Sequence, residues 1–264
     1  MRFRQALVSV TLNHLPTHEV ISLALEAGLE GIEWSGRNHL PVGDLKSAAF
    51  IQQQMKKAGL AVLAYGSYLR FNEPAFEQNQ LWQRTIETAL ALGAPAIRVW
   101  AGQQGSASVS FEERVALVNR AQAFADLAQH QGLAVYFEFH RKTLTDTPES
   151  ALNFLHEIDR SSVKSLWQPH VNLPLEEQLR SLELMLPQLA YLHCFFWGLK
   201  GSKERYPLQE GGALWQPLLE AALLYGHKDL DLWVAIEFVK DDKIEQLRED
   251  AAYLQQLLHT LNSN

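Results

Sequence analysis

The sequence predicts an α/β protein folded as a single (β/α)₈ barrel over residues 1–264. Short apolar runs rich in β-branched and aromatic residues recur along the chain, and each precedes a longer segment with helical periodicity. Eight such units in about 260 residues match the size of one barrel. A doubly wound open sheet is the main alternative. It normally uses five or six strands, and no GxGxxG motif follows the first apolar run.

The predicted strands are mostly continuous apolar runs, as expected of parallel strands that are buried on both faces. Their period and length distinguish them from the longer segments between them. In chain order they cover Ala6–Val10, Gly31–Trp34, Ala61–Tyr65, Ala96–Trp100, Ala134–Phe139, Val163–Trp167, Ala190–Phe196 and Leu232–Val239.

The predicted helices fill the intervals between these strands. Glycine ends the first four of them, shortly before the next strand, and proline opens two later ones. Asp44 and Ser110 are the expected N-caps of the second and fourth helices. The helix signals are Thr17 to Gly28, Asp44 to Gly59, Glu77 to Gly93, Ser110 to Gly132, the starts at Thr147-Pro148 and Leu173-Pro174, and the segments 213–225 and 241–261.

Composition and charge exclude several classes of protein. Apolar residues make up 47% of the chain, enough for a substantial core, and the formal net charge is −7. An acidic balance disfavours nucleic-acid binding, which depends on Lys and Arg at the phosphates. The single cysteine, Cys194, excludes an internal disulfide and a CxxC zinc site. No apolar run approaches the roughly 18 residues of a membrane span, and no secretory leader is recognisable. We therefore expect a cytoplasmic protein without membrane or nucleic-acid partners.

Polar residues stand at the ends of the last four predicted strands. The carboxyl ends of barrel strands form the active-site rim, so we expect the side chains of these four residues to converge. Two carboxylates, one amide oxygen and one imidazole suit Mn²⁺ or Mg²⁺ better than a closed structural zinc site. Each residue alone has an ordinary explanation as an ion-pair partner or a hydrogen-bonded core residue. The predicted ligands are Glu138, Gln168, His193 and Glu237.

Six segments of the chain carry a resemblance to a known family. They read GIEWSGRNHLPVGD (31–44), IRVWAG (97–102), EFHRKTLTDTPESALNFL (138–155), WQPHVNLPLEEQL (167–179), HCFFW (193–197) and IEFVKDD (236–242). These segments resemble the sugar phosphate isomerase/epimerase group of xylose-isomerase-like TIM barrels. The likeness extends from the first strand to the last helix, and the segments at 138–155 and 236–242 are its most specific parts.

The resemblance implies a divalent metal ion, with Mn²⁺ first and Mg²⁺, Co²⁺ or Zn²⁺ as alternatives, held by the same four residues. It implies an isomerase or epimerase of a small sugar or sugar phosphate. In such enzymes the metal-binding glutamates, here Glu138 and Glu237, transfer the proton through a metal-stabilised cis-enediolate. It also implies a homo-oligomer, since dimers and tetramers are frequent in this group.

Three positions depart from the pattern of the ketose 3-epimerases in this group. Gln168 stands where many of them have Asp, which removes one negative charge from the metal site. Leu144 occupies the position of their second Glu, and Val171, next to His170, that of a His. These departures weigh against a ketose 3-epimerase in particular, so the sequence supports the fold and the metal site better than a specific substrate.

Further residues at the predicted rim are candidate contacts to a sugar substrate. Aromatic rings there could stack on a sugar face, although large aromatics also close barrel cores. The charged loop 198–212 could act as a lid, or it could be an ordinary solvated loop. The candidates are His39, Tyr65, Trp100, His140, Arg141, His170 and Arg205.

Three other functions remain open on the sequence. A dehydratase of an inosose-like or dehydroshikimate-like substrate would share the first proton abstraction and then lose water. An endonuclease IV-like repair enzyme would need a cluster of about three zinc ions and a basic groove, which the net charge of −7 and the single ligand set disfavour. A non-catalytic sugar-binding protein would have kept the barrel and lost its catalytic activity.

Overall fold

The apolar runs form parallel strands in the computed structural model, which describes residues 2–72, 75–171, 173–226 and 231–263. Within these ranges the strands follow one another in chain order as a closed barrel, in which β1 pairs with β8. The predicted barrel is therefore confirmed. The strands are β1 (Phe3–Val8), β2 (Gly31–Ser35), β3 (Ala61–Gly66), β4 (Ala96–Val99), β5 (Ala134–Glu138), β6 (Val163–Trp167), β7 (Leu189–Cys194) and β8 (Leu232–Ile236).

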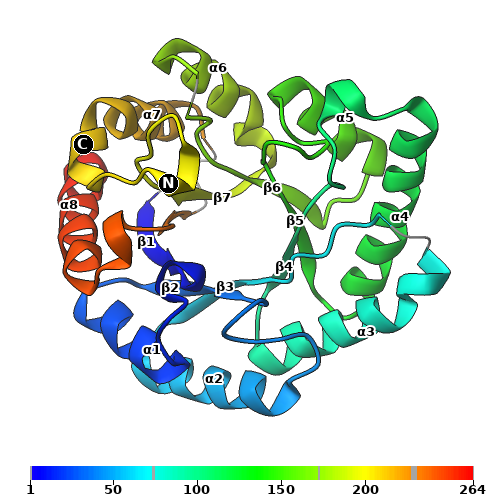
Figure 1. Ribbon diagram of the computed structural model, residues 1–264, viewed down its shortest axis with the longest axis horizontal. Coiled ribbons are helices and arrows are strands. Elements are labelled where there is room, and N and C mark those ends of the chain that lie inside the picture. The colour runs from blue at the N-terminus through cyan, green and yellow to red at the C-terminus, as the bar shows by residue number, and fades with distance from the viewer. Residues whose placement is uncertain (1, 73–74, 172, 227–230, 264) are drawn as a thin grey trace. The chain divides into compact units, whose positions relative to one another are not determined.

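An α-helix follows each strand within the described ranges. The oxygens of Asp44 and Ser110 accept hydrogen bonds from the backbone N–H groups of Ser47 (3.0 Å) and Glu113 (3.1 Å), as expected of N-caps. Figure 1 shows α3, α4 and α5 in sequence outside β4 and β5. The helices are α1 (Thr17–Glu26), α2 (Leu45–Ala58), α3 (Ala75–Leu92), α4 (Phe111–His130), α5 (Pro148–Ile158), α6 (Leu175–Met185), α7 (Gly212–Tyr225) and α8 (Ile244–Asn262).

Among the predicted strands, the first and the last differ most from the structure at their ends. The first was expected over Ala6–Val10, but β1 begins at Phe3, and 9–12 form a short 3₁₀ helix. The early start is possible because the Gln5 amide donates to the Gly28 carbonyl oxygen at 2.7 Å. The last was expected to reach Val239 but stops at Ile236, because Phe238 adopts a left-handed backbone with φ of 56°.

Contacts between residues divide the chain into two compact units. Unit 1 comprises 1–33, 54–61 and 167–264, and unit 2 comprises 34–53 and 62–166. The register pairs β1 with β2, β1 with β8 and β7 with β8 inside unit 1, whereas β3, β4, β5 and β6 pair inside unit 2. The expectation of one domain over 1–264 stays a prediction.

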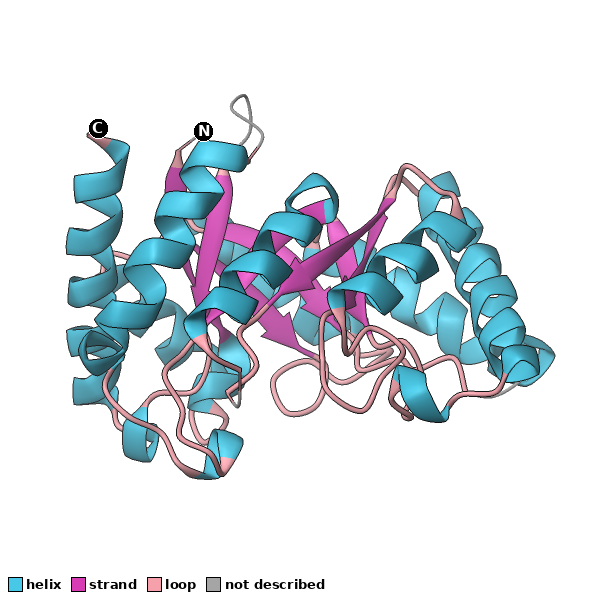
Figure 2. Cartoon of the chain, turned by 90° about the horizontal axis from the view of Figure 1, so that it is seen from above, coloured by secondary structure: helices cyan, strands magenta, loops and turns pink. Residues whose placement is uncertain are grey.

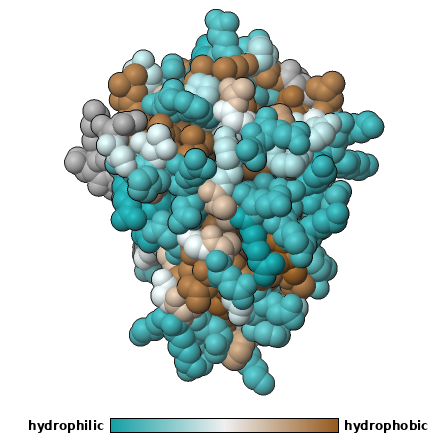
Figure 3. All heavy atoms as spheres, turned by 90° about the vertical axis from the view of Figure 1, so that its left-hand side faces the viewer, coloured by the Kyte–Doolittle hydropathy of each residue, from teal (hydrophilic) through white to brown (hydrophobic). Residues whose placement is uncertain are grey.

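The two ends of the chain meet in unit 1. The Phe3 backbone N–H donates to Asn262 Oδ1 at 2.8 Å, and Asn262 Nδ2 donates to the Phe3 carbonyl oxygen at 3.2 Å. Figure 2 shows both ends on one side, with α8 beside the first strand. The face shown in Figure 3 is mainly hydrophilic, interrupted by hydrophobic groups. No helix in the described ranges is both long and apolar enough to span a membrane.

Candidate active site

A buried hydrogen-bonded group in unit 1 joins the ends of β2 and β7. His193 Nε2 lies 2.8 Å from Glu33 Oε2, and the Tyr191 hydroxyl donates to the same oxygen at 2.7 Å. Tyr191 and His193 lie two positions apart on β7, and alternate residues of a strand share one face. His193 and Glu33 are fully buried. A carboxylate oxygen can only accept, so Nε2 is the nitrogen that carries a proton.

The other nitrogen of His193 faces the end of β8. Nδ1 lies 3.5 Å from Glu237 Oε2 and, within the described residues, is buried without a hydrogen bond. A lone pair on Nδ1 beside a carboxylate is stabilised only by a proton or a metal cation between them. Burial opposes protonation, but Glu237 and Glu33 together outweigh it and raise the pKa of His193 to about 10. This position attracts positive charge.

The positions of His193 and Glu237 fit their predicted role as two of the four metal ligands. Imidazole nitrogen and carboxylate oxygen are ordinary ligands for Mn²⁺ and Zn²⁺. Gln168, directly after β6, is also buried and belongs to the same unit. In the described part of the chain, no group of three or more His, Cys, Asp or Glu side chains is arranged to hold a metal ion. The convergence of all four ligands therefore stays a prediction.

Glu138, the predicted ligand in unit 2, lies in a second buried cluster. Arg98 Nη1 lies 2.9 Å from Glu138 Oε2, and the Trp100 indole N–H donates to the same oxygen. Only 1% of Arg98 and 3% of Glu138 are exposed. The pairing of β4 with β5 brings these residues together, with Arg98 opposite Tyr136. An ion pair this deeply buried requires close contact and further hydrogen bonds, which the indole supplies.

Arginine side chains gather on the aromatic rings of this second cluster. Arg70 lies 3.6 Å above the Trp100 ring, and Arg37 and Arg98 each lie 4.5 Å from the centre of the Tyr68 ring. Burial, then Arg37, lowers the pKa of Arg70, and Glu138 opposes this effect. Three guanidinium groups thus surround rings beside one carboxylate. We define Arg37, Arg70 and Arg98 as the arginine cluster; its excess positive charge suits an anionic ligand.

Several predicted substrate contacts also lie in unit 2. His140 stacks on Trp100, with ring centres 4.7 Å apart. His39 is buried, and its ring lies nearly perpendicular to that of Trp34, with ring centres 5.7 Å apart. Tyr65 is fully buried, its hydroxyl donates to a backbone oxygen, and burial raises its pKa well above the usual range. Arg141 is exposed. Trp100 and His140 thus belong to the arginine-lined cluster, whereas Tyr65 packs in the core.

The other two predicted contacts lie in loops of unit 1. His170 is partly exposed, and the Gln178 side chain hydrogen-bonds both its backbone N–H and its carbonyl oxygen. Arg205 pairs with Asp242 and lies 4.5 Å from the Phe238 ring centre. Arg205, in the loop that was expected to act as a lid, therefore links the loop after β7 to the loop after β8 through this ion pair.

Sequence reasoning missed part of both clusters. Arg98 interrupts the apolar run of β4 in the same way that Glu138 ends β5, so the signal that found the glutamate could also have found the arginine. Tyr191 shares the strand face of His193, which the two-residue period shows. Arg37 and Arg70 follow strands in polar loops, where nothing in the sequence distinguishes them from solvated residues.

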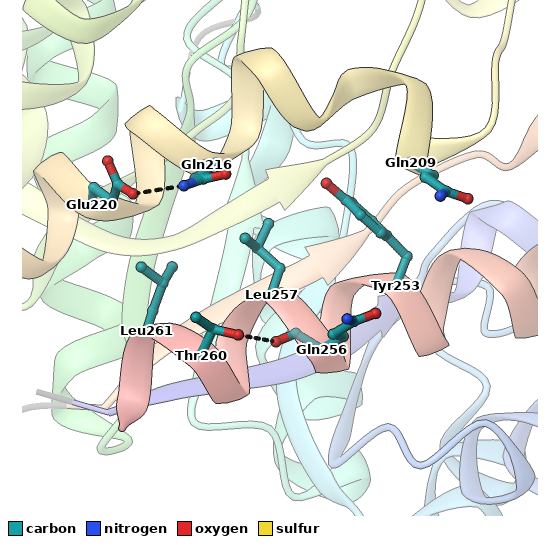
Figure 4. Close-up of a pocket in the computed structure, with 8 residues that line it drawn as sticks. All are labelled: Gln209, Gln216, Glu220, Tyr253, Gln256, Leu257, Thr260 and Leu261. Carbon is teal, nitrogen blue, oxygen red and sulfur yellow. Dashed lines mark hydrogen bonds between the residues drawn. The ribbon is translucent and has the colours of Figure 1, made fainter. Parts of the chain in front are cut away.

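A cavity of about 400 Å³ lies elsewhere in unit 1, between α7 and α8. Figure 4 shows polar side chains along both helices, with the Gln216 amide donating to Glu220 at 3.0 Å. None of the predicted site residues lines this cavity. Its lining is Gln209, Gln216, Glu220, Tyr253, Gln256, Leu257, Thr260 and Leu261.

Comparison with known proteins relates the chain to enzymes. A sequence family described as xylose isomerase-like TIM barrel matches residues 21–257. The chain is 31% identical over 201 residues to a 3-dehydroshikimate dehydratase from Bacillus anthracis, an alignment that covers 72% of this chain and 68% of that protein.

Solved structures share the fold along nearly the whole chain. The probable 3-DHS dehydratase AsbF from Bacillus anthracis superposes with a TM-score of 0.81 at 21% identity, over 97% of this chain and 99% of that one. A xylose isomerase-like TIM barrel protein from Mycobacterium smegmatis, in complex with magnesium, superposes with a TM-score of 0.71 at 16% identity, over 98% of both chains.

Proposed function

Because the chain belongs to the xylose isomerase-like TIM barrel family, we propose that it is a metal-dependent lyase. Its substrate would be a small cyclic hydroxy ketone that bears a carboxylate, as 3-dehydroshikimate does, and the reaction would remove water. The observation that carries this proposal is the arginine cluster beside Glu138. The 31% identity to a 3-dehydroshikimate dehydratase supports the same substrate class.

The arginine cluster supplies the expected recognition of a carboxylate. Arg98 is already paired with Glu138, so Arg37 and Arg70 provide the excess charge. A guanidinium presents parallel N–H donors that match the two oxygens of a carboxylate. Trp100, with Arg70 on its ring and His140 stacked on it, adds a flat surface for a planar ring.

The metal of this proposal would be held by Glu138, Gln168, His193 and Glu237. His193 and Glu237 fit this role, since an imidazole nitrogen without a hydrogen bond faces a carboxylate oxygen at 3.5 Å. When bound, a divalent cation polarises a carbonyl group and stabilises the negative charge that develops on its oxygen. A solved magnesium complex of similar fold supports a divalent ion.

Two carboxylates are proposed to move the protons. One takes the proton from the carbon next to the carbonyl group, and the hydroxyl group on the neighbouring carbon then leaves with a proton as water. The substrate loses one hydrogen and one hydroxyl group, and a carbon–carbon double bond forms. Glu138 and Glu237 are the proposed pair. Arg98 and Trp100 hold the Glu138 carboxylate in one orientation.

An isomerase or epimerase of a sugar phosphate is the second candidate. The positive charge of the arginine cluster favours it too, because a phosphate group is also an anion that guanidinium groups bind. The proton would then return to carbon, and no water would be lost. A neutral sugar makes no use of the cluster.

A substrate panel in deuterated water tests the proposal. Purified protein with Mn²⁺ is incubated with 3-dehydroshikimate, an inosose, sugar phosphates and free ketoses, and the products are identified by NMR. We expect loss of water from the carboxylate-bearing substrate, abolished in Glu138→Gln and Glu237→Gln. Deuterium incorporation into a sugar phosphate without water loss would establish the second candidate instead. Turnover of neutral ketoses alone would contradict both.

Replacement of Arg70 tests the recognition of the anion. Arg70→Ala should raise KM about 10- to 100-fold with little change in kcat, the loss expected for one charge-assisted hydrogen bond of about 1.5–3 kcal/mol. Arg114→Ala is the matched control, because it removes the same charge from α4 of the same unit, where Arg114 pairs with Glu157. An equal KM in the Arg70 variant and the wild type would contradict the role of the cluster.

A further inference from the structure

We infer that Glu33 is a positioning residue, which holds the His193 ring so that Nδ1 is the nitrogen available to a cation. The inference rests on the metal dependence proposed above. Glu33 is the last residue of β2 that pairs with β1 in unit 1, opposite Val8. It is fully buried, and the proton transfers of the proposed reaction make no use of it.

The contacts of His193 favour one tautomer of its ring. Nε2 lies 2.8 Å from Glu33 Oε2, whereas Nδ1 has no hydrogen bond in the described residues and lies 3.5 Å from Glu237 Oε2. The other tautomer, with its proton on Nδ1, would place the Nε2 lone pair against the Glu33 carboxylate. Because a carboxylate accepts and never donates when ionised, that arrangement would be repulsive.

A second donor fixes the carboxylate itself. The Tyr191 hydroxyl donates to the same Glu33 oxygen at 2.7 Å, from the position two residues before His193 on β7. Tyr191 is nearly buried, so water does not replace this contact easily. Tyr191, Glu33 and His193 therefore form a chain of contacts that ends at Nδ1. A histidine that binds a metal commonly donates its other N–H to a carboxylate in this way.

Binding of Mn²⁺ alone tests the inference without any substrate. The affinities of metal-free wild type and Glu33→Gln are measured by competition with a chelator. We expect Mn²⁺ to bind the variant roughly 10- to 100-fold more weakly, as for other lost partners of metal-binding histidines. Glu30→Gln is the matched control. It removes the same charge three residues earlier, from a carboxylate that pairs with Arg4 at 3.0 Å, and should leave the affinity unchanged.

The ring itself gives a readout that a merely structural role would not change. In Zn²⁺-loaded protein labelled with ¹⁵N, we expect wild-type His193 to show a protonated, hydrogen-bonded Nε2 and a metal-bound Nδ1. In Glu33→Gln the Nε2 proton signal should shift or broaden. Tyr191→Phe should weaken Mn²⁺ binding less than Glu33→Gln does, because the carboxylate remains.

Each outcome decides the inference. Equal Mn²⁺ affinity in Glu33→Gln and wild type would overturn it while leaving the proposed function intact. Metal bound through Nε2 in the wild type would overturn it even if the variant failed to fold. Wild-type protein that binds neither Mn²⁺ nor Zn²⁺ would remove the metal dependence of the proposed function, and this inference with it.

Discussion

Buried charged residues strongly constrain the structure of this protein. Arg98 and Glu138 are both almost fully buried and lie 2.9 Å apart. Such a pair adds little stability compared with apolar residues of similar size, but the loss of one member leaves an uncompensated charge in the interior. The pair therefore constrains the structure of the candidate site as much as its chemistry.

Arg98→Met should destabilise the protein by about 3–5 kcal/mol, because it leaves the Glu138 carboxylate without its ion-pair partner. Unfolding in urea, followed by circular dichroism, measures the loss. The double variant Arg98→Met with Glu138→Gln should recover part of it, since no buried charge remains. Arg114→Met breaks a more exposed pair with Glu157 and should cost less than about 1 kcal/mol. Similar losses in the two arginine variants would contradict this account.

Asp250 should make stability depend on pH. The residue is 4% exposed, and burial raises the pKa of its carboxyl group to about 6, from 3.8 in the unfolded chain. The unfolded state therefore releases its proton first, so the free energy of unfolding falls as the pH rises from about 4 to about 6 and is level above. Asp250→Asn should remove this loss and raise stability at pH 7 by about 3 kcal/mol.

Urea unfolding at pH 4, 5, 6 and 7 measures the difference in the free energy of unfolding between Asp250→Asn and wild type. This difference should grow with pH. Asp126 provides a control of opposite sign, because its hydrogen bond to Arg160 lowers its pKa. Asp126→Asn should lose stability near pH 7 and match the wild type at low pH. If Asp250→Asn raised the free energy of unfolding by the same amount at every pH, the pH dependence could not be assigned to the Asp250 carboxyl group.

At the scale of elements, the sequence predicts the order and type of the strands and helices well. Val163–Trp167 matches β6 at both ends, and Asp44 and Ser110 cap helices as expected. Strand ends are less predictable where a residue leaves the extended conformation. Phe238 continues the apolar run of β8, yet its φ of 56° is set by tertiary contacts, among them the hydrogen bond from its N–H to Thr11.

The candidate site is predictable only where a polar residue interrupts an apolar strand. That signal identifies Glu138, Gln168, His193 and Glu237 as strand-end residues, and the structure places all four there and buried. The sequence does not show which of these residues contact one another, nor which loop residues join them. The contact between His193 and Glu33 joins residues 160 positions apart, and Arg70 reaches Trp100 from a loop.

Close approach of two chain segments in unit 2 makes Gly36 sensitive to substitution. A Cβ atom at this position would lie 2.9 Å from the Gly66 carbonyl oxygen and 3.0 Å from the Tyr65 hydroxyl. Gly36→Ala should therefore cost about 1–3 kcal/mol, the range for overpacking. Unfolding in urea measures it. Tyr65→Phe removes one of the two obstacles, so the double variant should lose less stability than the sum of the single losses. Strict additivity would contradict this steric explanation.

Charge is distributed unevenly over the whole molecule. The net charge of −7 belongs to the full chain, whereas Arg37, Arg70 and Arg98 gather around two aromatic rings. An overall acidic protein disfavours non-specific contact with nucleic acid, and a local group of arginines can still select a small anion. The position between His193 and Glu237 has the opposite character and attracts cations. The two clusters thus differ in the charge they attract, as the proposed lyase with its anionic substrate and metal ion would require.

Metal binding should be visible in the unfolding of the whole molecule, because a ligand that binds only the folded chain stabilises it. Mn²⁺ at about 100 times its Kd adds about 2.7 kcal/mol, or roughly 5 to 10 °C in Tm for a protein of this size. Gln168→Asp should increase this shift in Tm at the same Mn²⁺ concentration, because it replaces the amide of a predicted ligand with a carboxylate. Residue 168 is only 5% exposed. Without metal the substitution should lower Tm, since the new carboxylate is buried. Gln216→Glu adds the same charge on α7 and should change neither quantity much. Thermal unfolding with and without Mn²⁺ decides: equal shifts in wild type and Gln168→Asp would show that residue 168 is not a ligand.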